Sequence, residues 1–195
     1  MLASITPLGE RSRGFSWQVT ATAFAIGAIG AGAAAGASVA ALGSLLPRGQ
    51  AWRTIALLVV LGIAFLCDAT PLRGRLPSTR RQVNEDWMTR YRGWVYGVAF
   101  GAQLGVGVAT IVTSAAIYAT GAVVFLCGDP AIGAAIGAVF GLVRAMSLLP
   151  ARRARDSKSL LELHRVLGAN EPYVRRATPV LELLLAAALV MVWIV

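Results

Sequence analysis

The chain has 195 residues, of which 57% are hydrophobic and only 14% are charged, with a net charge of +9 and a mean hydropathy of +0.69. A soluble domain of this size carries about 25% charged residues, so the composition excludes an ordinary soluble protein. The apolar residues form blocks of 17 to 33 separated by arginine-rich linkers, which is the pattern of a polytopic membrane protein. No linker is long enough to build a second core, so we predict one transmembrane domain over residues 1–195.

The basic residues and the scarcity of nucleophiles narrow the function further. Seventeen of the eighteen basic residues are arginines, and all but Arg144 lie between the apolar blocks or at their ends. They therefore favour a bilayer with anionic headgroups as the partner and not nucleic acid. His164 is the single histidine, and Cys67 and Cys127 are the two cysteines, so metal clusters and Ser–His or Cys–His sets are hard to assemble. We expect no enzymatic activity, no cofactor and no metal.

The first two predicted spans cover residues 17–46 and 52–68. The first follows a short lead with two arginines and is about twice as long as the apolar region of a signal peptide, so we interpret it as a retained anchor. Between residues 27 and 41 its side chains are almost all small. This thinness predicts a helix at the centre of the bundle, with Gly32 and Gly36 as contact points.

A basic segment, residues 70–92, separates the second span from the third. Within it, Asn84 is placed to cap a short helix that carries Trp87 and Tyr91 into the membrane interface. The third predicted span, residues 94–126, holds 33 residues without one charge, which is more than the about 20 that cross a bilayer.

Polar and small residues lie on different faces of this third span. At helical spacing, the polar residues predict a polar stripe, made by Gln103, Thr110, Ser114 and Tyr118. The glycines predict a packing face, made by Gly97, Gly101 and Gly105. The polar stripe could line a substrate path. The alternative is that it forms hydrogen bonds between helices, at about 0.6 kcal/mol each.

The fourth predicted span, residues 131–149, repeats the packing pattern at Gly133, Gly137 and Gly141. Residues 150–176 are basic again. Inside them Ser159-Leu160-Leu161-Glu162 matches a capping box, and Gly168 is placed to end the helix that it begins. This short amphipathic helix either lies on the membrane surface or is an ordinary connector. The fifth predicted span, residues 177–195, is rich in leucine.

The distribution of arginine and lysine predicts the orientation. With five spans and a cytoplasmic N-terminus, the inner segments 1–16, 70–92 and 150–176 hold 2, 6 and 7 basic residues, against two in the outer loops. The positive-inside rule therefore places 70–92 and 150–176 in the cytoplasm of a bacterium, with the bundle in its plasma membrane.

Three ionisable residues lie within or at the edge of the predicted spans: Asp68, Arg144 and Glu182. An ionised group in a bilayer costs about 2.5–3.5 kcal/mol on the mildest scale, so such residues usually pair or line a cavity. One hypothesis is that Arg144 pairs with Glu182 or Asp68 at the inner mouth of a polar path. The alternative is that Arg144 and Glu182 extend to the headgroups.

Two further patterns are an internal repeat and a resemblance of part of the chain to a known family. A weak internal repeat relates the halves, since a Leu-Pro motif followed by arginine comes after both the second and the fourth span. The run GVAFGAQLGVG at residues 97–107, followed by a small-residue helix and the segment AIGAAIG at 131–137, resembles the DsbD/cytochrome-c-biogenesis transmembrane family, within the LysE-type exporters. The resemblance covers roughly residues 94–150.

Members of that family move reducing equivalents through a Pro-flanked cysteine in each of two corresponding helices. The corresponding stretches of this chain, residues 31–38 and 105–114, contain neither cysteine nor proline. The resemblance therefore implies a transport or assembly role in place of a thiol relay, and it assigns no catalytic residue.

We thus predict an all-α bundle of five transmembrane helices. The leading functional hypothesis is a small transporter or exporter of a polar or anionic solute, which at this size implies a homo-oligomer. The alternative is a non-catalytic assembly or scaffold subunit that packs against a larger membrane complex. A membrane-embedded enzyme is a third hypothesis that lacks a recognisable nucleophile, metal set or carboxylate pair.

Overall fold

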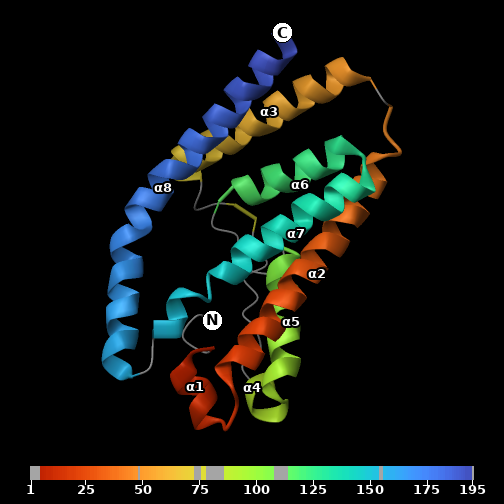
Figure 1. The fold of residues 1–195 in the computed structure, drawn as a ribbon. Coiled ribbons are helices and arrows are strands. Elements are labelled where there is room, and N and C mark those ends of the chain that lie inside the picture. The colour runs from red at the N-terminus through yellow and green to blue at the C-terminus, as the bar shows by residue number, and fades with distance from the viewer. Residues whose placement is uncertain are drawn as a thin grey trace.

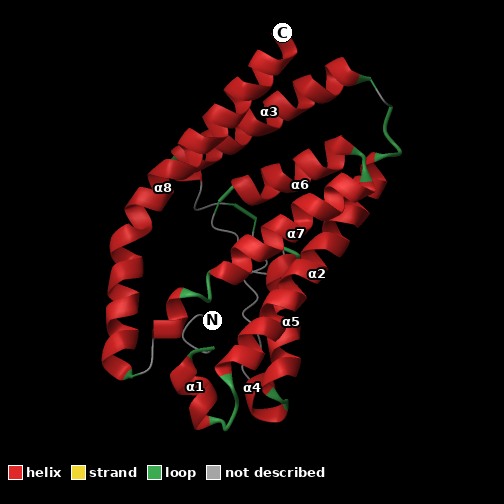
Figure 2. Cartoon of the chain, in the orientation of Figure 1, coloured by secondary structure: helices red, strands yellow, loops and turns green. Residues whose placement is uncertain are grey.

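The computed structural model describes residues 5–47, 49–72, 76–77, 86–107, 114–153 and 156–194, and the regular structure in these ranges is helical (Figures 1 and 2). In chain order the helices are α1 (Pro7–Ser12), α2 (Trp17–Gly43), α3 (Gln50–Ala69), α4 (Trp87–Arg90), α5 (Gly93–Gly105), α6 (Ala116–Cys127), α7 (Pro130–Met146), the 3₁₀ turn η2 (Pro150–Arg153) and α8 (Ser157–Ile194).

Helix α2 packs most extensively against α7 and α5 (Figure 1). Glycines make both contacts. A Cβ added to Gly36 would overlap the carbonyl oxygen of Gly133, and one added to Gly101 would overlap that of Phe24. The same backbone approach occurs at the other glycines predicted to pack these helices, Gly32, Gly97, Gly105, Gly137 and Gly141. Helix backbones come this close only where no side chain separates them.

The order of these contacts fixes the helix directions. Along α2, successive contacts with α5 rise in residue number, from Gly97 beside Thr20 to Gly105 beside Ala28. The contacts with α7 fall, from Gly133 beside Gly36 to Gly141 beside Ala28. Helix α5 is therefore parallel to α2, and α7 is antiparallel to it.

Helices α3 and α8 form a second layer beside α2, α5 and α7. The second half of α8 lies along α3, and α6 packs against both α3 and α2 (Figure 1). A small buried cluster joins the layers: Leu61 and Ala64 of α3 pack with Ala115 and Ala119 at the start of α6, and Ala186 of α8 covers them.

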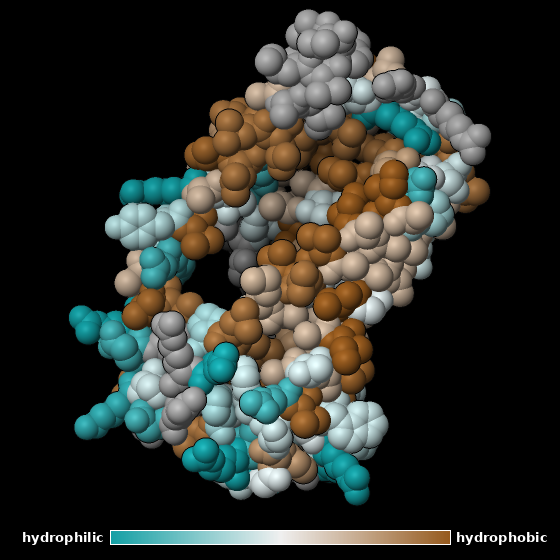
Figure 3. Space-filling view, viewed as in Figure 1, coloured by the Kyte–Doolittle hydropathy of each residue, from teal (hydrophilic) through white to brown (hydrophobic). Residues whose placement is uncertain are grey.

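Three helices of the described residues are long and apolar enough to cross a membrane: Trp17–Gly43, Ala51–Ala69 and Pro130–Arg152. Large apolar side chains on their outer faces are exposed, among them Ile26, Ile63 and Val139. Figure 3 shows this apolar surface over the upper and middle parts of the molecule, whereas hydrophilic side chains gather at the end that holds α1 and α4.

The single helix predicted over residues 94–126 is wrong. The structure has two helices there, because α5 ends at Gly105 and α6 begins at Ala116. Gly107, next to the end of α5, adopts a φ of 81°, which is left-handed and takes the backbone out of the helix. A uniform apolar composition did not reveal this interruption.

The division of residues 150–195 into a short surface helix and a separate helix over 177–195 is also wrong, whereas a crossing over 177–195 stays a prediction. Helix α8 runs unbroken from Ser157 to Ile194, through Gly168 and two prolines. The cap lies three residues before the predicted one: Asp156 Oδ1 accepts the Ser159 N–H at 2.7 Å, and Ser159 Oγ accepts the Asp156 N–H at 3.1 Å. This reciprocal pair is the capping box of α8. Gly168 lies on an exposed face and needs no left-handed turn.

The short helix expected near residue 87 is α4, although its predicted cap, Asn84, lies outside the described residues. The Trp87 ring stacks on Phe100 of α5 with centroids 6.2 Å apart, and Tyr91 meets the Trp87 ring edge-on at 6.1 Å. Trp87 therefore packs against the bundle core.

Candidate functional site

The interruption between α5 and α6 is the feature of the bundle that most resembles a site. Non-helical backbone at membrane depth is tolerated only where it is buried in protein or lines a cavity. Gly107 packs against α7, since a Cβ added to it would lie 3.2 Å from the ring of Phe140. Residues 108–113, which include the predicted path residue Thr110, lie outside the described chain.

Asp68, at the end of α3, holds the start of α6. Its carboxylate accepts a hydrogen bond from the Ser114 hydroxyl at 2.5 Å and from the Ala115 N–H at 2.9 Å. The Asp68 side chain is buried, with 5% of its surface exposed. A carboxylate at a helix N-terminus satisfies free N–H groups and opposes the positive end of the helix dipole. The sequence predicts Asp68 and Ser114 on one polar path, and the structure brings them into direct contact.

A cavity of about 200 Å³ lies beside the interruption. Its walls come from α2, α5, α6 and α7, and they are made largely of small and apolar residues, including Gly36, Gly105, Gly107, Gly121 and Phe140. Thr120 supplies a hydroxyl at the wall, but this group already donates to the Ala116 carbonyl at 2.8 Å. The cavity can therefore hold a small neutral or weakly polar molecule, and its described lining residues carry no charge.

The other predicted path residues are dispersed. Gln103 is half-buried on α5 and does not line this cavity. Tyr118 is 37% exposed, and its hydroxyl donates to the carbonyl of Pro77 in the segment between α3 and α4. The tyrosine thus ties α6 to that segment. A continuous polar stripe on one helix does not form, because residues 103 and 118 lie on different helices.

Arg144 and Glu182, the residues of the predicted ion pair, lie on two different helices, α7 and α8. Arg144 is half-buried on α7, and its guanidinium carbon lies 5.4 Å from the centroid of the Phe140 ring, a cation–π contact. Glu182 is buried on α8, with 3% of its surface exposed. Phe140 also lines the cavity, so Arg144 contacts a wall residue of the cavity without lining the cavity itself. The proposed pairing of Arg144 with Glu182 or Asp68 stays a prediction.

A buried polar cluster at the hydrophilic end was missed by sequence analysis. The Glu10 carboxylate, fully buried, accepts hydrogen bonds from the Tyr96 hydroxyl at 2.6 Å, the Thr20 hydroxyl at 2.7 Å and the Arg13 guanidinium at 2.6 Å. Gly93 makes room for it, since an added Cβ would lie 2.6 Å from Thr20 Oγ1. The cluster joins α1, α2 and α5.

Arg13 is the cationic partner in this cluster, and its environment stabilises its charged form. Burial by itself lowers the pKa of Arg13, but the hydrogen bond and the attraction from Glu10 outweigh burial and raise the pKa above its ordinary value. The guanidinium also lies over the Tyr96 ring, 5.9 Å from its centroid. These contacts make the cluster a structural clamp.

The two cysteines are both free thiols, half-buried on different helices, Cys67 in α3 and Cys127 at the end of α6. The described residues contain no group of three or more His, Cys, Asp or Glu side chains that could hold a metal ion.

Comparisons with known proteins give one informative likeness. No protein-family model matches the chain, and no solved structure matches it. Over 101 residues the chain is 35% identical to a protein of Paracoccus versutus described as methylamine utilization protein MauF. The match covers 49% of this chain and 37% of that protein, so it spans little more than a third of its relative's length. The resemblance to the DsbD and LysE-type families stays a prediction.

Proposed function

We propose that the chain is an integral membrane protein that acts as an accessory subunit in the utilisation of a small amine. The observation that carries this proposal is the 35% identity over 101 residues to a protein described by methylamine utilisation. The three long apolar helices support the membrane part of the proposal. The glycine contacts of α2, α5 and α7 support a rigid packed unit in place of one that opens and closes.

Five crossings remain our proposal for the topology. Helix α5 has 13 residues and α6 has 12, so each is about 20 Å long or less and falls short of the about 30 Å hydrocarbon layer. They follow one another along α2, since Gly97 contacts its first turn and Phe125 meets Gly43 at its end. Together they would make one interrupted crossing, and the second half of α8 would make the fifth.

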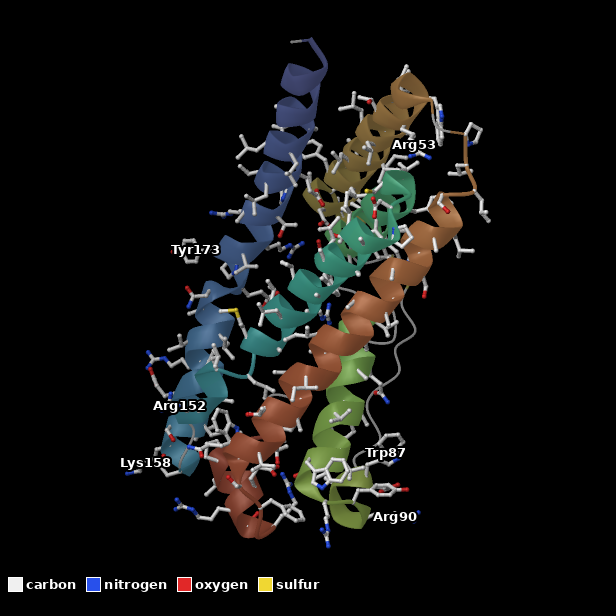
Figure 4. The ribbon with its side chains drawn as sticks, turned by 45° about the vertical axis from the view of Figure 1, so that its right-hand side comes forward. Arg53, Trp87, Arg90, Arg152, Lys158 and Tyr173 are labelled. Carbon is white, nitrogen blue, oxygen red and sulfur yellow. The ribbon has the colours of Figure 1, made fainter. Side chains whose placement is uncertain are left out.

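We place the hydrophilic end in the bacterial cytoplasm. Arg90, Arg152 and Lys158 lie toward this end, and Arg53 lies at the opposite one (Figure 4). Arg53 donates to the carbonyls of Cys127 at 3.3 Å and Leu46 at 3.4 Å, near the ends of α6 and α2. This outer arginine therefore neutralises helix C-termini, whereas the inner ones remain to meet anionic headgroups.

Transport is the second candidate, and the interrupted crossing is the observation that favours it. Membrane transporters commonly bind their substrates where helices are broken. Here the break adjoins a cavity of about 200 Å³ with Thr120 in its wall. Such a site would suit a small solute of low charge better than the anionic solute of the sequence-based hypothesis.

Deleting the gene in its host separates the two candidates. Growth with methylamine and growth with ammonium as the nitrogen source are compared, together with uptake of ¹⁴C-methylamine and methylamine oxidation by cell extracts. An accessory subunit predicts lost growth on methylamine, normal uptake and lost oxidation. A transporter predicts lost uptake and normal oxidation in extracts.

Two controls make the experiment decisive. The gene is restored on a plasmid, and ammonium growth must be unchanged in every strain. Unaffected growth, uptake and oxidation after deletion would contradict a role in amine utilisation. If the complemented protein co-purifies in mild detergent with no other subunit, the accessory role would be contradicted as well.

A further inference from the structure

A second cavity, polar and separate from the one at the helix interruption, lies at the start of α2. Its volume is about 310 Å³, and it lies open to the surface where α1, α2 and η2 meet. The lining residues are Pro7, Leu8, Arg11, Ser16, Trp17, Gln18 and Arg152. Figure 4 shows Arg152 toward the hydrophilic end of the molecule. The cavity therefore lies where the first long apolar helix leaves the polar region.

The cavity has a positive charge that its walls do not balance. Arg11 comes from α1 and Arg152 from η2, and no acidic residue is among the described residues that line it. The nearest acid in the sequence is Glu10, whose carboxylate is occupied by Arg13, Tyr96 and Thr20. Two arginines in the wall of one polar cavity suit an oxyanion, and a phosphate above all.

The start of α2 adds to this potential. Ser16 is the N-cap residue, yet its side chain makes no capping hydrogen bond, and the first turn of α2 contains no acidic residue. The free N–H groups of a helix N-terminus carry partial positive charge and bind phosphate oxygens. Ser16, Trp17 and Gln18 bring this end of the helix into the cavity wall.

A shallow apolar groove on α2 adjoins the same cavity. Gln18 lines both, and the groove is made by Val19, Thr22, Ala23 and Ile26, which follow one face of the helix. Ile26 is 64% exposed and Val19 is 54% exposed. A ligand that occupies both places must have an anionic head and an apolar tail.

We propose that this surface binds one anionic phospholipid, with its phosphate between Arg11 and Arg152 and an acyl chain along the groove on α2. The lipid is the occupant that matches both parts, since a soluble phosphate would leave the groove empty. This inference rests on the membrane placement of α2 and is independent of any role in amine utilisation. The bound lipid would join α1 and η2 to the first crossing.

Native mass spectrometry of the full-length, delipidated protein tests the proposal. Phosphatidylglycerol is titrated in competition with phosphatidylcholine of the same chains. The wild-type protein is expected to prefer phosphatidylglycerol about tenfold. The double variant R11Q/R152Q should bind phosphatidylglycerol roughly 30-fold more weakly, which corresponds to the loss of two headgroup-binding arginines. Dihexanoyl phosphatidylglycerol should compete poorly, because its short chains do not fill the groove.

The matched control is R90Q/K158Q, which removes the same charge from the same end of the molecule and should keep wild-type binding. Equal weakening in both double variants, or no headgroup preference in the wild type, would overturn the proposal. Binding of glycerol 1-phosphate as tightly as phosphatidylglycerol would also overturn it, because the site would then recognise a soluble phosphate and not a lipid. If R11Q/R152Q does not fold, the single variants R11Q and R152Q take its place, and each must weaken phosphatidylglycerol binding more than R90Q does.

Discussion

At the residue scale, Glu10 is the side chain on which the hydrophilic end of the bundle depends. Its buried carboxylate accepts hydrogen bonds from Arg13, Thr20 and Tyr96. Hydrogen bonds to a charged group contribute about 1.5–3 kcal/mol each, so Glu10→Gln should lower the free energy of unfolding by about 2–3 kcal/mol. Thermal unfolding in detergent measures this loss. Glu171→Gln, an exposed acid on α8, is the control, and an equal effect of both changes would show that Glu10 is not a clamp.

Asp156 gives the second residue-scale prediction, because its charge caps α8. The hydrogen bond from the Ser159 N–H lowers the pKa of Asp156. A depressed folded-state pKa means that the cap is fully formed above the unfolded pKa of about 3.9 and is lost as the pH falls through the folded value. Hydrogen exchange at the first turn of α8 should therefore speed up below about pH 4, after correction for intrinsic rates. In Asp156→Ala this exchange should be fast at every pH; slow exchange at neutral pH would contradict the cap.

At the element scale, Asp68 caps the N-terminus of α6 from the end of α3. Asp68→Ala removes the acceptor of the Ser114 and Ala115 hydrogen bonds, so amide exchange at the start of α6 should increase, by at least tenfold if about 1.4 kcal/mol of capping is lost. Asp129→Ala is the matched control, since Asp129 caps α7 in the same way through Ala131 at 2.8 Å. That variant should loosen α7 only. Unchanged exchange at α6 in Asp68→Ala would contradict the assignment.

The helix contacts of α2 give a second element-scale prediction with a built-in comparison. Gly36→Ala places a methyl group against the Gly133 backbone, which must move away, so we expect a loss of about 1–3 kcal/mol. Gly30→Ala lies in the same helix with nothing within 4 Å of the new Cβ, so it should be neutral or slightly stabilising. Thermal unfolding of both variants measures the difference. Equal midpoints would mean that α2 and α7 do not pack through their backbones.

At the scale of the whole molecule, the sequence predicts the structural features that local residue patterns determine. It does not predict the features that depend on contacts between distant residues. Glycine spacing identifies the faces that meet, such as Gly36 and Gly133, because the absence of a Cβ is a local property. The start of α6 after the interruption is capped by Asp68, a residue far away in the sequence that was interpreted as an ion-pair partner. The helical spacing of the polar residues continued across the interruption and concealed it.

Glu10 was missed for a related reason. It lies in a short polar lead outside every apolar block, where an acid is usually solvated. One local signal was present: Thr6 and Pro7 begin a helix in the manner of an N-cap followed by proline, and Glu10 lies in its first turn. The burial of Glu10 comes from Tyr96, which no local pattern connects to it.

The central claim is that the apolar outer faces of this bundle lie in lipid. Spin labels at single cysteines, with Cys67 and Cys127 replaced, would be placed at positions 63, 139 and 184, where the native residues are exposed and apolar, and at Lys158 as the polar reference. In proteoliposomes the account predicts that the first three labels collide with oxygen more than with a water-soluble nickel complex, and that the label at 158 does the reverse. Preferential nickel collisions at 63, 139 and 184 would contradict the membrane bundle.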